Sequence, residues 1–218
     1  AFIIWLPKIR GKQAKTGAST VQRVSFTALL RSGLAWQVTF YMGLQSIGFY
    51  TMAAWFPEIL HSRGFSLSFA GWLIAVIQFI SMFSMFFVPI WAARRASQHS
   101  FVVVISILMF FGYLSLFSQH MGFLMMAVFL LGLGQGASFA LAVSFFGLRS
   151  RNAQQAAMLS GMAQSIGYLI SAIGPISFGV LYDWTGSWTW PLICLTATSI
   201  LLLVVGLGAS RDRYVSVE

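Results

Sequence analysis

The sequence predicts an all-α integral membrane protein with six transmembrane helices. Of its 218 residues, 58% are hydrophobic and only 8% are charged, whereas a soluble domain carries about 25% charged residues. The mean hydropathy is +0.83. The 13 basic and four acidic residues all lie outside six apolar stretches, as expected because a charge at the centre of a bilayer costs about 2.5–3.5 kcal/mol. This composition excludes both a water-soluble globule and a disordered chain.

The chain begins with a short apolar segment and a basic linker. Residues 1–7 (AFIIWLP) are expected to be the end of a preceding transmembrane helix, which makes the sequence a fragment. Residues 8–33 are polar and basic and contain no acid, so we expect a cytoplasmic linker between two domains. A short amphipathic helix near residues 20–31 is the alternative for part of this linker.

A six-helix transmembrane bundle is predicted over residues 34–209, followed by a cytoplasmic tail over residues 210–218. Each span needs about 20 apolar residues to cross the hydrocarbon. The predicted spans are 34–56, 70–91, 101–118, 123–147, 155–181 and 188–208.

Tryptophans mark the ends of the predicted spans. Trp36 and Trp55 lie at the two ends of the first span, and Trp72 and Trp91 at the ends of the second. The amphipathic indole ring prefers the headgroup level of a bilayer. The tryptophans therefore support the boundaries of these spans independently of the charges.

The basic residues predict the orientation of the bundle. Lysine and arginine crowd the linker, the loops after the second and fourth spans, and the tail, whereas the opposite loops hold only Arg63. The positive-inside rule then places both ends of the chain in the cytoplasm. The net charge of +9 is thus explained by topology. Since the basic residues are dispersed among loops, no nucleic-acid binding is expected.

Neutral polar side chains inside the spans are the candidate substrate-binding groups. An amide that faces lipid leaves its hydrogen bonds unmade, so the spans that carry amides (the first, second, fourth and fifth) should turn them to a cavity or to one another. The third and sixth spans carry only hydroxyls and should be outer helices. The selected substrate-binding residues are Tyr41, Gln45, Gln135, Gln164 and Tyr168.

Each of these residues has an alternative role in helix packing, because interhelical hydrogen bonds also hold membrane bundles together. Two further polar lines accompany them: Ser46 and Tyr50 in the first span, and Gln78 and Ser81 in the second. The methionines and phenylalanines nearby are interpreted as core filling.

Small residues and one proline predict close packing and movement of helices. The fourth span carries Gly132 and Gly136 four residues apart, a spacing that lets helix backbones approach closely. In the fifth span, Gly174-Pro175 should break or kink the helix because proline removes a backbone hydrogen bond. Gly167, Gly174 and Pro175 are therefore assigned to helix flexibility and gating. A packing kink without a gating role is the alternative.

The sequence lacks the motifs of catalysis and metal binding. No paired carboxylates, metal-ligand spacing or phosphate-binding loop is present, and Cys194 is the single cysteine. No histidine, lysine or aspartate lies inside a span to activate a serine. We therefore expect no enzyme activity, no cofactor and no metal. A proton-carrying acid within the membrane is also absent from these residues.

A faint internal repeat connects the two halves of the bundle. With an offset of 90 residues, Gln45 falls on Gln135 and Phe49 on Phe139. This offset passes three spans, so the two copies would have inverted topology, as in many secondary transporters.

Two motifs carry a family resemblance. The first span holds Trp36-Gln37 and then Gly43-Leu44-Gln45-Ser46, and the fifth holds Gln154-Gln155-Ala156-Ala157 and a run that continues to Gly174-Pro175. The sequence from about Trp36 to Arg211 is similar to the cyanate permease and 2-nitroimidazole transporter family of the major facilitator superfamily. In one departure, the loop after the second span reads Ala92-Ala93-Arg94-Arg95 and lacks the acidic residue of the superfamily motif.

The resemblance implies a fold and a function. The chain would be the C-terminal half of a 12-helix major facilitator fold, built from 3+3 inverted repeats, in a bacterial inner membrane. It would pair with the N-terminal six-helix half and move a small polar or anionic solute, cyanate- or nitroimidazole-like, by alternating access. A transporter of another small organic molecule or a drug exporter is the first alternative. A receptor or channel derived from the same fold is a more remote one.

Overall fold

The computed structural model describes residues 26–216, and this part of the chain is all-helical. Residues 1–7, most of the expected linker and the last two residues of the tail lie outside the described residues. The helices are α2 (Phe26–Arg31), α3 (Gly33–His61), α4 (Leu67–Ala92), α5 (His99–Ser115), α6 (Met121–Leu148), α7 (Ala153–Thr185) and α8 (Thr189–Ala209). The six-residue α2 falls where a short linker helix was one of the expectations.

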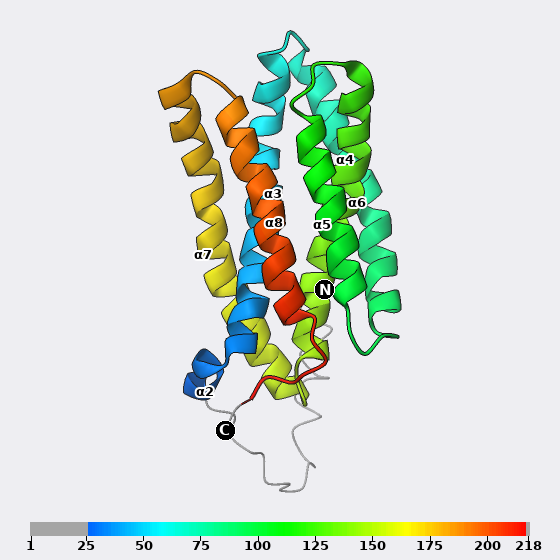
Figure 1. Ribbon diagram of the computed structural model, residues 1–218, viewed down its shortest axis with the longest axis vertical. Coiled ribbons are helices and arrows are strands. Elements are labelled where there is room, and N and C mark those ends of the chain that lie inside the picture. Colours follow the sequence, from blue (N-terminus) through cyan, green and yellow to red (C-terminus); the bar gives the residue numbers. More distant parts are fainter. Residues whose placement is uncertain (1–25, 217–218) are drawn as a thin grey trace, which may run out of the picture.

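The six helices α3 to α8 run alternately up and down in one bundle (Figure 1). Each overlaps one of the six predicted apolar stretches. The turns that carry Arg94, Arg95 and Arg151 lie at the same end as the tail, and the turn with Arg63 lies at the opposite end. The segregation of basic residues in the sequence is therefore also a segregation in space among the described residues.

Four of the described helices are long and apolar enough to cross a membrane, namely α4, α6, α7 and α8. The apolar helix α5 has only 17 residues. Helix α3 has 29 residues but is interrupted by more polar side chains. These lengths and compositions support a multi-pass helical membrane protein.

Local sequence signals explain where several helices begin and end. The side chains of Ser66, His120 and Asn152 accept hydrogen bonds from the first turns of α4, α6 and α7, which satisfies amides that have no partner within the helix. Helix α7 ends at Gly186, where φ is +61°. This left-handed conformation is favourable for glycine and closes a helix C-terminus.

Helix α6 forms the centre of the bundle, and α4 and α7 form its exposed flanks. In the most apolar window of each helix, 67% of α6 residues are buried, against 28% for α4 and 22% for α7. Helix α6 packs against α4 and α5, while α3 packs against α7 and α8. The exposed sides of α4 and α7 therefore remain available for lipid or for another part of the protein.

A buried arginine ties the helix ends together on the side of the tail. Arg149 donates to the carbonyl oxygens of Ala209 and Ser210 at 3.0 and 3.1 Å, and to the side chain of Gln98. Asp212 lies 4.0 Å away. Burial lowers the pKa of Arg149, and the Asp212 carboxylate partly offsets this effect. The arginine thus joins the ends of α5, α6 and α8.

Candidate functional site

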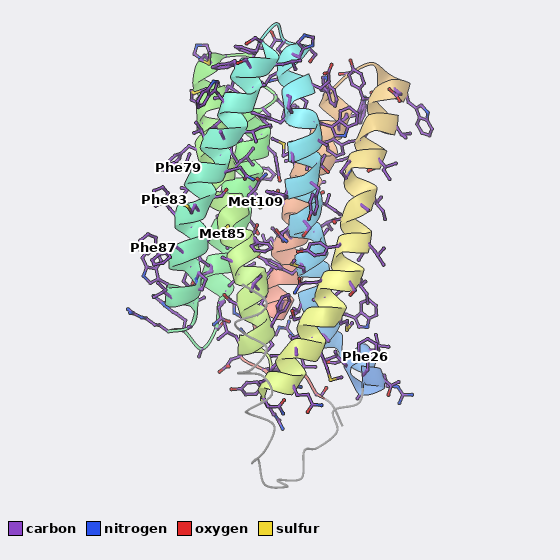
Figure 2. All side chains as sticks on the ribbon, turned by 180° about the vertical axis from the view of Figure 1, so that it is seen from behind. Phe26, Phe79, Phe83, Met85, Phe87 and Met109 are labelled. Carbon is purple, nitrogen blue, oxygen red and sulfur yellow. The ribbon has the colours of Figure 1, made fainter. Side chains whose placement is uncertain are left out.

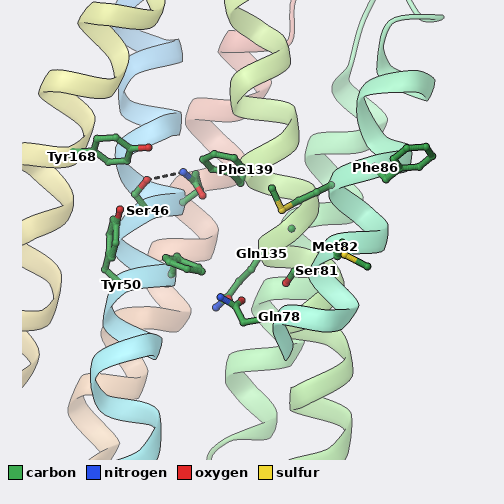
Figure 3. A pocket seen from close by; sticks show the side chains of 13 residues that line it. Ser46, Tyr50, Gln78, Ser81, Met82, Phe86, Gln135, Phe139 and Tyr168 are labelled. Atoms are coloured by element: carbon green, nitrogen blue, oxygen red, sulfur yellow. Dashed lines mark hydrogen bonds between the residues drawn. The ribbon is translucent and has the colours of Figure 1, made fainter. Parts of the chain in front are cut away.

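Polar side chains from four helices converge on one cavity of about 650 Å³. The helices are α3, α4, α6 and α7, which are the four whose spans carry amides, and neither α5 nor α8 contributes. Figure 3 shows the cavity from close by. Its polar lining residues are Gln45, Ser46, Tyr50, Gln78, Ser81, Gln135 and Tyr168.

The cavity opens on the face that α4 and α7 flank. Figure 2 shows this face, with α4 toward one edge and α7 at the other. Tyr168 on α7 is 37% exposed and Met82 on α4 is 56% exposed. A solute could therefore reach the polar groups from this face without passing through the bundle.

Two amides from different helices lie in the same part of the cavity. Gln78 on α4 and Gln135 on α6 reach toward one another in Figure 3. The side-chain nitrogen of Gln135 is buried and lacks a well-aligned hydrogen-bond partner. The Tyr113 hydroxyl lies nearby and interacts with the Gln135 side chain. A buried N–H group without a full partner is a ready donor to a ligand.

The opposite part of the cavity combines an amide, hydroxyls and aromatic rings. Gln45 is almost fully buried, and its side-chain nitrogen donates to Ser46 Oγ at 2.6 Å. The ring centroids of Tyr50 and Tyr168 lie 6.3 Å apart, and Tyr168 points its hydroxyl from α7 toward Ser46 (Figure 3). Phenol hydroxyls both donate and accept, so this part suits a polar planar ligand.

The remaining walls are apolar, and here the interpretation as core filling was wrong for several residues. Met82, Met85 and Phe86 of α4 are exposed and line the cavity instead of the core. Phe49 and Phe139 also line it, although Phe139 packs in addition against the core. The apolar composition of a membrane core resembles that of a ligand site, so residue type alone does not distinguish the two. No acidic or basic residue lines the cavity in the described part of the chain.

The structure brings together Gln45, Gln135 and Tyr168 of the five selected residues, but not Tyr41. Tyr41 is fully buried, with its ring 5.4 Å from that of Phe145 and in contact with Gly206 on α8. Four residues of helix rotate by about 40° beyond one turn. A side chain on the same stripe as Gln45 can thus face a neighbouring helix instead of the cavity.

Gln164 also lies outside the cavity lining. It is one turn nearer the start of α7 than Tyr168, a rise of about 6 Å, and its side-chain nitrogen donates to Ser160 Oγ at 2.6 Å. A contact between Gln164 and a solute remains a prediction. Conversely, Ser46, Tyr50, Gln78 and Ser81 do line the cavity. The sequence showed these four polar side chains along the first and second spans, but they were not among the predicted substrate-binding residues.

The residues assigned to flexibility lie where α7 meets α3. Gly167 contacts the backbone of Gly43, and a methyl group at Gly174 would come within 2.6 Å of Thr51 Oγ1. Helix α7 continues through Pro175, so of the expected break or kink the break does not occur, and a kink there remains a prediction. The Pro175 carbonyl accepts a hydrogen bond from the Trp55 indole at 2.8 Å, which anchors α7 to α3 beside the proline.

Relatives of this chain are bacterial transporters. It is 42% identical over 216 residues to the uncharacterized transporter YycB of Bacillus subtilis, covering 99% of this chain and 53% of the relative. It is 34% identical over 215 residues to the 2-nitroimidazole transporter of Escherichia coli, covering 99% and 54%. The similarity extends over nearly the whole of this chain, which is therefore homologous to about half of each of these transporters.

A more distant relative is the cyanate transport protein CynX of Escherichia coli, which is 25% identical over 189 residues, covering 85% of this chain and 48% of the relative. The chain spans about half the length of the curated relatives that it matches. No protein-family model matches the chain, and no solved structure does. The relatives are transporters rather than enzymes, in agreement with the absence of catalytic motifs.

Proposed function

We propose that the chain is the C-terminal six-helix half of a 12-helix secondary transporter of the major facilitator type. Both ends of the segment would lie in the cytoplasm of a bacterium, and the N-terminal half of the same protein would close the exposed face between α4 and α7. Support comes from the twofold length of the relatives. The arrangement of the basic residues at one end also supports it.

The observation that carries the proposal is the uncharged polar cavity on that exposed face. Its volume of about 650 Å³ lies within the ordinary range of small-molecule sites, about 300–1,000 Å³. In a transporter of this architecture, the solute binds near the membrane midplane between the two halves. A cavity that is lined by four helices and open on the face that the proposed N-terminal half would close suits that arrangement.

The chemistry of the lining favours a small polar or anionic planar solute. Amide and hydroxyl groups of Gln45, Gln78 and Gln135, with Tyr168, offer hydrogen-bond donors to negatively charged oxygen atoms. Phe49 and Phe139 offer aromatic surface for stacking on a planar group. A hard cation would lack the carboxylate ligands that it prefers. Cyanate-like and nitroimidazole-like solutes meet these requirements.

Transport would proceed by alternating access, with the two halves rocking about the central site. Gly167 and Gly174 would let α7 slide or tilt against α3, and Pro175 would soften α7 because it removes one backbone hydrogen bond. None of the described cavity residues is ionisable near neutral pH, so the carrier of a coupling ion would lie elsewhere in the protein.

Uptake by the full-length protein in proteoliposomes tests this proposal. Labelled 2-nitroimidazole and labelled cyanate are offered separately, each with and without a pH gradient. Saturable uptake of either solute, above that of empty liposomes, is the expected result. Absence of saturable uptake of both solutes by correctly folded protein would refute the proposed solute class.

A further inference from the structure

A second groove lies between α4 and α5, on a different face of α4 from the polar cavity. Its volume is about 410 Å³, and only two of its lining residues, Ser84 and Ser100, are polar. Phenylalanines of α4 form one wall, and Figure 2 shows Phe79, Phe83 and Phe87 in line along the edge of the molecule that faces away from α7. The groove is therefore directed away from the solute cavity.

The groove ends at a tryptophan. Trp91 lines it at the last turn of α4, is 54% exposed, and has its ring centroid 5.7 Å from that of Phe87. Ser100 lines the groove at the first turn of α5. Indole rings favour the headgroup level of a bilayer. The groove thus runs from the hydrocarbon up to the polar interface.

Two arginines lie in the turn between α4 and α5, and this turn follows Trp91 and precedes Ser100 of the groove lining. Arg94 and Arg95 follow Ala93, the C-cap residue of α4, and both are exposed. Neither makes an ion pair within residues 26–216. The acidic residue found at this end of the described chain, Asp212, lies 4.0 Å from Arg149 instead. The interfacial end of the groove therefore carries two positive charges that no described side chain neutralises.

We propose that this groove binds an anionic phospholipid, with an acyl chain along Phe83, Phe87 and Val104 and the phosphate against Arg94 and Arg95. An acyl chain alone gives little selectivity, because lipid tails are as apolar as the groove. Basic residues at the interface attract anionic headgroups, and guanidinium groups match phosphate oxygens in pairs. The positive charge at the turn is therefore the feature that favours an anionic lipid over a neutral one.

A second copy of this chain is a poorer occupant. Two copies packed side by side through this groove would bring four unneutralised arginines to the same end of the membrane, and the sequence carries a net charge of +9. The lipid proposal requires only that the chain is embedded in a membrane. It does not depend on the proposed transport activity, so either proposal can fail without the other.

Native mass spectrometry of the full-length protein tests the charge requirement. The protein is equilibrated with equal amounts of phosphatidylglycerol and phosphatidylcholine, and the retained lipids are counted. The expected result for the unmodified protein is preferential retention of phosphatidylglycerol. In Arg94→Gln/Arg95→Gln, this preference should fall about fivefold for each arginine removed. The matched control, Arg211→Gln/Arg213→Gln, changes two exposed arginines of the tail and should keep the preference. Equal retention of both lipids by the unmodified protein would overturn the proposal.

Fluorescence quenching of Trp91 tests the location. Lipids brominated in the acyl chain quench a tryptophan that they touch, and the difference between the unmodified protein and Trp91→Phe isolates this residue. Brominated phosphatidylglycerol should quench Trp91 more than brominated phosphatidylcholine does, and Arg94→Gln/Arg95→Gln should remove the difference. Failure of both lipids to quench Trp91 would mean that the other half of the protein or a second copy covers the groove, and would overturn the proposal.

Discussion

Gly136 on α6 packs directly against the backbone of Ser81 on α4. A methyl group at position 136 would overlap the Ser81 carbonyl oxygen and come within 2.6 Å of Ser84 Oγ. The Ser81 hydroxyl also donates to the Gly132 carbonyl at 2.8 Å. Because Ser81 and Gly136 both line the solute cavity, the close approach of the two helices fixes one wall of the proposed site.

Replacing Gly136 by alanine should separate α4 from α6. Overpacking of this kind costs about 1–3 kcal/mol, so the thermal midpoint of the full-length protein in detergent should fall and solute uptake should decrease. Gly147→Ala is the matched control on α6, since a methyl group there meets no atom within 4 Å. Equal midpoints for the two variants would show that the contact is looser than described.

Gln135→Leu should weaken solute binding with little effect on folding. The change removes one hydrogen-bond donor from the cavity, and a single hydrogen bond contributes about 0.5–1.5 kcal/mol. The half-saturation concentration for uptake should rise by about two- to tenfold. Tyr41→Phe is the control, because the Tyr41 hydroxyl is buried without a hydrogen-bond partner. Unchanged uptake kinetics in Gln135→Leu would place Gln135 among the packing residues.

Gly174→Ala should slow transport by crowding the contact between α7 and α3. The added methyl group would come within 2.6 Å of Thr51 Oγ1, and the helices would have to separate or lock. We expect a lower maximal uptake rate. Gly161→Ala lies on α7 in open space and should leave the rate unchanged. A normal rate in Gly174→Ala would argue against movement at this contact.

Arg149→Gln should destabilise the protein far more than Asp212→Asn. Arg149 is buried and bonds to two backbone carbonyls and to Gln98, and hydrogen bonds from a charged group contribute about 1.5–3 kcal/mol each. Asp212 is 66% exposed, so its pairing contributes at most about 1 kcal/mol. Thermal unfolding of the two variants measures the difference. Similar midpoints would mean that the Arg149 bonds contribute little.

The helices could be predicted from the sequence because the hydrocarbon excludes charge. The six uncharged stretches coincide with α3 to α8, but α3 continues past Glu58 to His61. A helix can extend into polar residues once it leaves the apolar region, so the charge pattern underestimates its length. The backbone of α7 also stays helical at Pro175, where the neighbouring α3 supplies Trp55 as a partner.

The cavity could be predicted only in part. The cavity is lined by helices of the four spans that carry amides, and Gln45 and Gln135 are among the residues there, but α7 contributes Tyr168 and not its amide Gln164. The periodicity of a single helix defines a polar face but not which neighbour covers that face. For this reason Tyr41, on the stripe of Gln45, is buried against α6 and α8. Gln78 lines the cavity because α4 packs against α6, and this packing cannot be predicted from the sequence of α4 alone.

Solute counterflow tests the central claim most directly. Proteoliposomes that contain the full-length protein are loaded with unlabelled 2-nitroimidazole and diluted into a trace of labelled solute. A transporter with a single alternately exposed site predicts transient accumulation of label above equilibrium, reduced by Gln135→Leu and retained by Tyr41→Phe. Simple equilibration of the label, at a rate that does not saturate, would contradict alternating access and indicate a channel.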